Sequence, residues 1–283
     1  MSSFQKSSKV VCKYCGGNHV IKFGSYKEIQ RYLCTSCERK FKNNDHLFHM
    51  GVPAQYVEYV LNSYYDGMKI KDIRETMKLN FGYCPSPTLI HLWIEKYTAM
   101  ASEMVRDHRP VAGKTWVLNE MILMLYRQKL WTYELIDDKT GYILASSISM
   151  QRKPFIRPFL QKIIAITNII PSVIMVYIPV SRYKELKKGV DYPFVHVPKE
   201  TYADRHRIGI TGNSSLYDTD KYRIKNTHNL RTPETAGKYL TGLFIHHNYF
   251  RRNPDLNNRT PAEAALISYP YHSWKALVER SIG

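Results

Sequence analysis

Four cysteines near the beginning of the chain place the strongest constraint on its fold. They form two CxxC pairs, Cys12 with Cys15 and Cys34 with Cys37, and eighteen residues separate the pairs. Each pair can turn two thiolates towards one tetrahedral ion, and four thiolates complete the coordination shell of a structural zinc. A segment of about 40 residues cannot fold on so small a core, so the metal would supply most of its stability. We therefore predict a zinc ribbon over residues 1–45, with a short hairpin between the cysteine pairs.

The charge of the chain predicts a polyanionic partner. Lys and Arg total 41 against 24 acidic residues, which gives a net charge of +17. The basic residues recur along the whole chain, as expected for a folded surface that follows a phosphate backbone. A basic surface that only keeps the protein in solution is the alternative. Residues 1–45 alone carry nine basic against three acidic residues, so the ribbon is predicted to contact nucleic acid through Lys22, Arg31, Arg39 and Lys40.

The sequence gives no sign of export or of a membrane span. Its first residues lack the apolar core of a signal peptide. Its most apolar stretch, residues 163–180, is interrupted by Asn168, Pro171 and Ser172. We expect a cytoplasmic, nucleoid-associated protein, in which reduced cysteines bind metal and do not form disulfides. The fifth cysteine, Cys84, is expected to be a core or loop thiol.

Three amphipathic helices are predicted within residues 50–109, in a helix-turn-helix order. The third begins with Ser86 as N-cap and Pro87 at the first helical position. In helix-turn-helix proteins the last helix enters the major groove of DNA. Three such helices can also form a purely structural bundle, so both interpretations stay open. The outward residues that could reach bases or phosphates are Thr88, His91, Glu95 and Lys96.

The pattern changes to strands from Thr115 onward. Three consecutive antiparallel strands are predicted, then a helix, and then shorter strands that alternate with helices. This order indicates an α/β domain with a mixed sheet over residues 112–270, followed by a C-terminal tail over residues 271–283. The predicted strands are residues 115–126, 129–138, 142–149, 173–178 and 194–197.

Three segments carry a resemblance to a known family. Trp116–Met121, Leu130–Ser149 and Phe244–Ile267 resemble the insertion-sequence DDE transposases that have a zinc ribbon, a helix-turn-helix and a ribonuclease H-like catalytic core. The resemblance implies an α/β fold of ribonuclease H-like type, double-stranded DNA as the partner, and a homodimer or larger assembly on DNA. The segment from Thr260 to Glu263 also matches a helix start with a capping box.

The resemblance also implies three carboxylates that hold two divalent metals, Mg²⁺ or Mn²⁺, if catalysis is retained. This chain has Asn119, Ile178 and Ser214 at those positions, or Asp218 at the third if the alignment shifts. The triad is therefore predicted to be lost. The other acids that could form a rearranged site, or could simply be surface and turn acids, are Glu120, Asp137, Asp138, Asp218 and Asp220.

A basic and aromatic segment follows between residues 204 and 260. It holds ten Lys or Arg against five acids, a composition that suits a phosphate track. The DNA contacts expected here are Arg205, Arg207, Arg223, Arg251 and Arg252.

Three functions follow from this sequence. The first is a DNA-binding protein of transposase type, degenerate or co-opted, that recognises inverted-repeat-like DNA and is catalytically inactive. The second is an active transposase that uses relocated carboxylates. The third is a regulatory subunit or inhibitor of active relatives, with structural zinc.

Overall fold

The computed structural model describes two compact units, residues 1–53 and 54–281, and each is described by itself. The described residues are 10, 12, 18–26, 29–42, 52–125, 128–150, 156–176, 183–184, 187, 192–197 and 232–281. Several predicted site residues lie outside them, namely Cys15, Ile178, Arg205, Arg207, Ser214, Asp218, Asp220 and Arg223.

The first unit is a three-stranded antiparallel sheet. Its strands are β1 (Val20–Tyr26), β2 (Ile29–Cys34) and β3 (Lys40–Lys42), in the order β1-β2-β3. The predicted hairpin between the cysteine pairs is confirmed, whereas β3 was not predicted. A register shift between Lys22 and Ser25 interrupts the pairing of β1 with β2, and Gly24 adopts a φ of +67° within it.

Three helices open the second unit, as the apolar spacing predicts. They are α2 (Ala54–Tyr65), α3 (Ile70–Phe81) and α4 (Pro87–Val105). Ser86 caps α4 as predicted, because its side chain accepts a hydrogen bond of 3.1 Å from the Leu89 amide.

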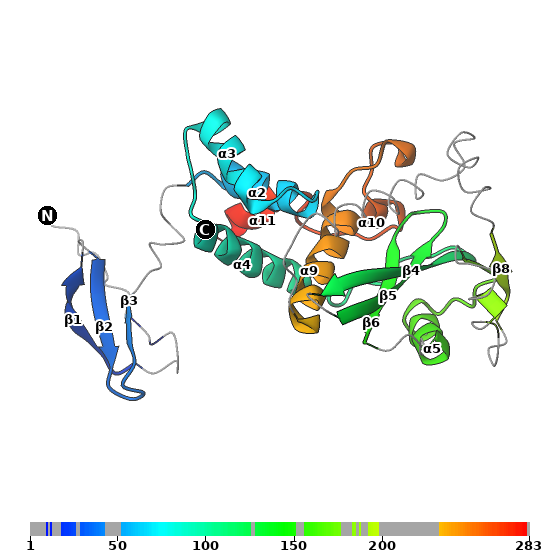
Figure 1. The fold of residues 1–283 in the computed structure, drawn as a ribbon, viewed down its shortest axis with the longest axis horizontal. Coiled ribbons are helices and arrows are strands. Elements are labelled where there is room, and N and C mark those ends of the chain that lie inside the picture. The colour runs from blue at the N-terminus through cyan, green and yellow to red at the C-terminus, as the bar shows by residue number, and fades with distance from the viewer. Residues whose placement is uncertain are drawn as a thin grey trace, which may run out of the picture. The chain divides into compact units, whose positions relative to one another are not determined.

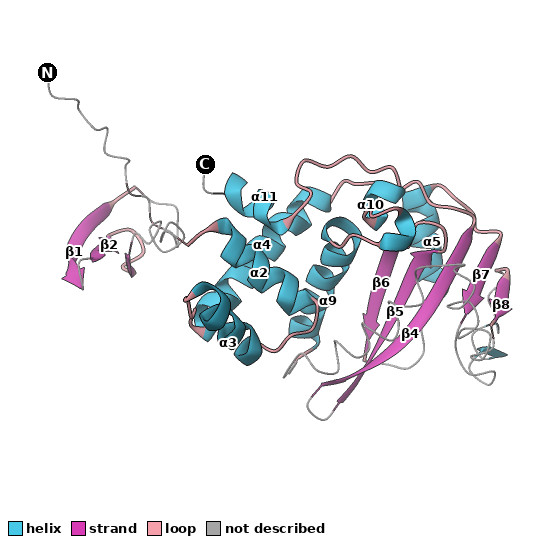
Figure 2. Ribbon diagram, turned by 90° about the horizontal axis from the view of Figure 1, so that it is seen from above, coloured by secondary structure: helices cyan, strands magenta, loops and turns pink. Residues whose placement is uncertain are grey.

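A five-stranded mixed sheet follows (Figure 1). Its strands are β4 (Thr115–Leu125), β5 (Gln128–Asp137), β6 (Ile143–Ser149), β7 (Val173–Val176) and β8 (Phe194–His196). The order across the sheet is β6-β5-β4-β7-β8, which Figure 2 shows from above. The first three strands pair antiparallel, and β7 and β8 continue the sheet in parallel. The prediction of three antiparallel strands in a mixed α/β sheet is confirmed.

The two faces of the sheet bury different clusters. On one face, Leu160 and Ile163 of α5 (Ile156–Thr167) pack against Trp116 and Leu118 of β4. On the other face, Phe244 of α9 (Pro233–Ile245) packs with buried residues of β4, β5, β6 and β7. Alternate residues along β4 therefore pack against helices on opposite faces of the sheet, because successive side chains of a strand point to opposite sides.

The C-terminal segment is folded back onto the first helices. After α9 come a π-helix η1 (His246–Phe250), a 3-10 turn η2 (Pro254–Leu256), α10 (Pro261–Ala264) and α11 (Trp274–Arg280). The predicted tail over residues 271–283 thus contains a helix that was not expected. Trp274 is fully buried and stacks on Tyr65 of α2, with ring centroids 5.8 Å apart. None of the described helices is long and apolar enough to span a bilayer.

Candidate functional site

The cysteines of the ribbon converge as the spacing predicts. The sulfurs of Cys12, Cys34 and Cys37 all lie within 4.8 Å of one another, and those of Cys12 and Cys37 are 3.6 Å apart. Four thiolates about 2.3 Å from a tetrahedral zinc would be about 3.8 Å apart, so the observed separation fits zinc. A disulfide would need about 2.05 Å. The cluster could hold a metal such as zinc; Cys15, the predicted fourth ligand, lies outside the described residues.

Cys84 is an exposed loop thiol. The Arg74 guanidinium donates to its sulfur over 3.6 Å and to the Pro85 carbonyl over 2.7 Å.

The position implied for the first catalytic carboxylate lies in the centre of the sheet. Asn119 is buried on β4, the strand that pairs with both β5 and β7. Its Nδ2 atom donates a hydrogen bond of 3.3 Å to Oε2 of Glu134, the directly opposite residue on β5. Residue 119 is therefore an amide that is hydrogen-bonded to the buried carboxylate of Glu134. Ile178 and Ser214, at the other two positions, lie outside the described residues.

Glu134 was missed among the candidate acids. It is only 6% exposed, and buried carboxylates are uncommon unless they are paired. The pairing of Leu125 with Gln128 belongs to the register that sets Glu134 beside Asn119. The strand bounds predicted from the sequence, 115–126 and 129–138, imply a different register, so the sequence did not indicate this contact.

Asp137, one of the acids proposed for a rearranged site, caps a turn. Its Oδ1 accepts the Gly113 amide at 2.6 Å, and its Oδ2 accepts the amide and hydroxyl of Thr140 at 2.9 and 2.6 Å. The Oδ2 atom thus stabilises the turn between β5 and β6, where Gly141 has a φ of +69°, and the Oδ1 atom binds the segment that precedes β4. Ligation of a metal would require these bonds to break.

The remaining described acids do not converge either. Glu120 accepts the Tyr133 hydroxyl over 3.1 Å, and Asp138 lies half-buried at the start of the same turn. Across the described part of the chain, the cysteine cluster is the one group of three or more metal-binding side chains within ligand distance of one another.

The π-helix η1 joins distant parts of the second unit through polar side chains. Asn248 binds both backbone groups of Ile143, with Oδ1 accepting the amide at 2.9 Å and Nδ2 donating to the carbonyl at 3.1 Å. His247 donates to the Gly141 carbonyl over 2.9 Å, and Trp274 donates to His246 over 3.1 Å. The adjacent histidines therefore contact different partners and hold the C-terminal helices against the sheet.

Tyr249 extends this network towards the linker between the helices and the sheet. Its hydroxyl lies 2.8 Å from that of Tyr142 and 3.1 Å from Nδ1 of His108. Burial raises the pKa of Tyr249 above its ordinary value, and burial lowers the pKa of His108. Both groups are thus stabilised in their neutral forms.

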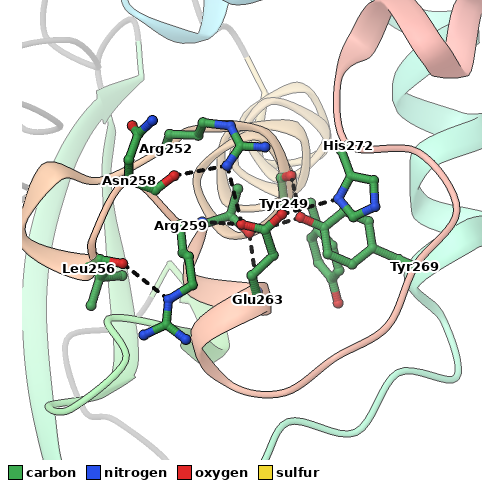
Figure 3. Close-up of polar contacts among 9 residues, drawn as sticks. Tyr249, Arg252, Leu256, Asn258, Arg259, Glu263, Tyr269 and His272 are labelled. Carbon is green, nitrogen blue, oxygen red and sulfur yellow. Dashed lines mark hydrogen bonds and ion pairs between the residues drawn. The ribbon is translucent and has the colours of Figure 1, made fainter.

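The loop after η1 is held by several polar contacts, which include those of Arg252 and Arg259 (Figure 3). Glu263 accepts the Thr260 amide at 2.8 Å in the predicted capping box, which is confirmed. It also contacts Arg252 at 3.5 Å and His272 at 3.1 Å. Arg252, predicted to bind DNA, and Arg259, which was not predicted, are both exposed, and each donates to a carbonyl of this loop, Arg252 to Asn258 and Arg259 to Leu256. Arg251 is half-buried.

The outward face of α4 is accessible but not strongly basic. Thr88, His91 and Glu95 are exposed, as predicted. Lys96 is half-buried, and this burial lowers the pKa of its amine below the ordinary value. Any contact with DNA at this helix would therefore depend more on its N-terminal residues than on its net charge.

The predicted basic residues of the ribbon lie on its strands and on the turn between β2 and β3. Lys22, Arg39 and Lys40 are exposed, and Arg31 is half-buried. Arg31 and Lys40 both approach the ring of Phe23, which the sequence had not singled out.

No protein-family model and no curated protein matches this chain. Solved structures are similar to it over part of its length. The HTLV-2 integrase catalytic core domain in complex with magnesium, in its dimeric form, shares 13% identity over 56% of this chain and 98% of that chain, with a TM-score of 0.31. The simian T-cell lymphotropic virus intasome in complex with PP2A regulatory subunit B56 gamma shares 12% identity over 58% of this chain and 60% of that chain, with a TM-score of 0.35.

The piggyBac transposase synaptic complex with hairpin DNA shares 9% identity over 81% of this chain and 70% of that chain, with a TM-score of 0.34. Sequence identities of 9–13% and TM-scores of 0.31–0.35 are too low for the activities of these proteins to be assigned to this chain. The function is therefore argued from the residues of this chain.

Proposed function

We propose that this chain is a DNA-binding protein of transposase-like architecture that recognises inverted-repeat-like duplex DNA and does not carry out strand transfer. The observation that carries the proposal is the buried Asn119 in the centre of β4, hydrogen-bonded to Glu134. The family resemblance implies a metal-binding carboxylate at this position. The mixed five-stranded sheet, in which three antiparallel strands are followed by two parallel ones, supports the architecture.

The chemistry of strand transfer explains why an amide at this position matters. Two divalent metals activate the attacking oxygen and stabilise the leaving oxygen, and anionic ligands hold them. An amide oxygen is a neutral ligand, and Ile178 at the second implied position has no oxygen in its side chain. The loss of each anionic ligand removes several kcal/mol of metal binding, which corresponds to a rate loss of several decades.

The DNA-binding part of the proposal is supported by charge and by the ribbon. The net charge of +17 attracts a polyanion, and a metal bound by the cysteine cluster would stabilise the basic hairpin. The capped N-terminus of α4 presents Thr88 and His91 to solvent. We assign the ribbon, residues 1–45, and the helices, residues 50–109, to DNA recognition, and residues 112–270 to the core.

A second candidate function is metal-dependent strand transfer with a relocated carboxylate. It is favoured by one observation, the burial of Glu134 beside the first implied catalytic position. This carboxylate could contribute one anionic ligand from β5.

One experiment separates the two functions. The full chain is used to select its preferred sites from a random duplex library, and the selected DNA is then tested for cleavage and joining with Mg²⁺ or Mn²⁺. We expect salt-dependent, sequence-selective binding without cleavage or joining. Metal-dependent joining that is lost in Glu134→Gln would establish the second function. Equal affinity for every duplex would refute specific recognition.

A further inference from the structure

We propose that the face of the ribbon turned away from the cysteines carries a binding site for backbone phosphates of duplex DNA, built on Phe23, Arg31 and Lys40. This inference rests on the proposed function and deepens it. The three residues come one each from β1, β2 and β3. We call them the Phe23 cluster.

The register of the strands places Arg31 and Lys40 on the side opposite the metal-binding residues, and their contacts with Phe23 place its ring there as well. Val20 pairs with Cys34, and Val20 and Tyr32 pack around the cysteines. Ile21 pairs with Leu33, and Leu33 pairs with Lys40 on the following strand. Because side chains alternate along a strand, these positions share the other face of the sheet.

The ring of Phe23 gathers two cations. The Lys40 Nζ atom is 4.2 Å from the ring centroid, and the Arg31 guanidinium carbon is 5.9 Å from it. Each such contact attracts the cation to the ring and restricts a long side chain that would otherwise be mobile. The aromatic ring therefore holds both charges in place before any ligand binds.

These two charges are not neutralised within the described part of the chain. Neither Arg31 nor Lys40 forms an ion pair with a described carboxylate, and the acid within residues 18–26 and 29–42 is the exposed Glu38. Two like charges beside one ring repel each other, and an anion between them would remove that repulsion. The Arg31 guanidinium and the Lys40 ammonium can both donate charge-assisted hydrogen bonds to the oxygens of one phosphate.

The exposed apolar surface beside the cations favours DNA over a small free anion. Ile21 is 51% exposed and Phe23 is 36% exposed. A free phosphate would leave these side chains in water, whereas the sugars of a DNA backbone can cover them while their phosphates reach the cations. The occupant we assign is therefore the backbone of duplex DNA.

The test measures how strongly binding depends on salt. Binding of the metal-loaded full chain to a labelled duplex is titrated by fluorescence anisotropy at several salt concentrations. Each phosphate contact contributes about 0.9 to the slope of log affinity against log salt concentration, so Arg31→Gln with Lys40→Gln should lower that slope by about 2. Phe23→Leu, which changes no charge, should weaken binding roughly 5-fold because it frees both cations.

Controls separate the cluster from general charge and from unfolding. Lys238→Gln removes an exposed charge that is paired with Glu234 on α9, and it should leave the slope within error of the wild type. Every variant should retain the wild-type content of bound metal. If the double variant keeps the full slope while the wild type binds DNA, the Phe23 cluster is refuted and DNA binding stands. If the wild type itself does not bind duplex DNA, the proposed function fails as well.

Discussion

Replacing Asn119 by Asp tests the geometry at the centre of the sheet. The Asn119 Nδ2 atom lies 3.3 Å from Oε2 of Glu134, so the substitution would put a carboxylate oxygen where a hydrogen-bond donor now lies. Two full charges at about that distance repel by about 5 kcal/mol at an effective dielectric constant of about 20. A shared proton relieves part of this repulsion. We therefore expect a net loss of about 3 kcal/mol at neutral pH, including the lost hydrogen bond.

The loss should depend on pH in a defined direction. The neighbouring carboxylate raises the folded-state pKa of the new acid above its unfolded value of about 4. The Asn119→Asp variant should therefore be least affected in acid, should lose stability as pH rises above that unfolded value, and should level off above the folded pKa. Thermal unfolding followed by circular dichroism at pH 5 and pH 8 measures this difference, with a melting temperature roughly 6–12 °C below the wild type at the higher pH.

Two further measurements make the test specific. The swapped pair Asn119→Asp with Glu134→Gln restores one amide and one carboxylate, so it should recover most of the lost stability. Mn²⁺ should stabilise Asn119→Asp alone more than the wild type, because a divalent cation can bridge two carboxylates. The reasoning is wrong if Asn119→Asp melts like the wild type at both pH values, or if the swap gives no recovery.

Three other substitutions or conditions test features outside the sheet centre. Leu266 has a φ of +59° and is 73% exposed, so Leu266→Gly should stabilise the fold by about 1 kcal/mol, measured by urea denaturation; Leu266→Ala, which keeps the Cβ, should not. A Cβ on Gly242 would overlap with the Tyr65 phenol, so Gly242→Ala should destabilise the fold by roughly 1–3 kcal/mol, and the added variant Tyr65→Leu should recover part of that loss. Burial raises the pKa of Tyr64, Tyr65 and Tyr249 above the ordinary value of 10.0, so their contribution to stability is complete below that pH and is lost above it. Exposed residues among the 22 tyrosines ionise without unfolding, so the last part of the rise in phenolate absorbance should coincide with the loss of helical circular dichroism, and complete ionisation before unfolding would contradict the burial of these three.

The elements of the fold follow from local patterns that the sequence displays. Alternating apolar residues predicted the strands. Ser86 and Thr260 predicted two helix N-termini, and the structure confirms both. Caps and strand alternation act within a few residues, so they can be recognised without knowledge of the tertiary structure. The helix over residues 274–280 had the same kind of signal, because Ser273 caps it. Its seven residues are too few for a helical stripe to stand out.

The candidate site depends on contacts between residues far apart in the sequence. Glu134 can be recognised as part of the site only once the strand register sets it beside Asn119. The role of Asp137 can be recognised only once its carboxylate is seen to accept hydrogen bonds from a turn. Neither environment is visible in composition or in spacing along one strand. The Arg252 guanidinium likewise binds the Asn258 carbonyl at 2.8 Å, a contact that the composition of its segment did not indicate.

The segment Phe244–Ile267, one of the three that resemble the transposase family, makes contacts that stabilise the fold. Asn248 and His247 bind the backbone where β6 begins, and Thr260 and Glu263 cap a helix. These contacts stabilise the sheet and the helices whether or not a metal binds in the core. A resemblance carried by such residues therefore argues for architecture and does not bear on catalysis. In the proposed function, strand transfer would need a negative charge at the centre of β4, where Asn119 contributes none, so the architecture can be kept while catalysis is lost.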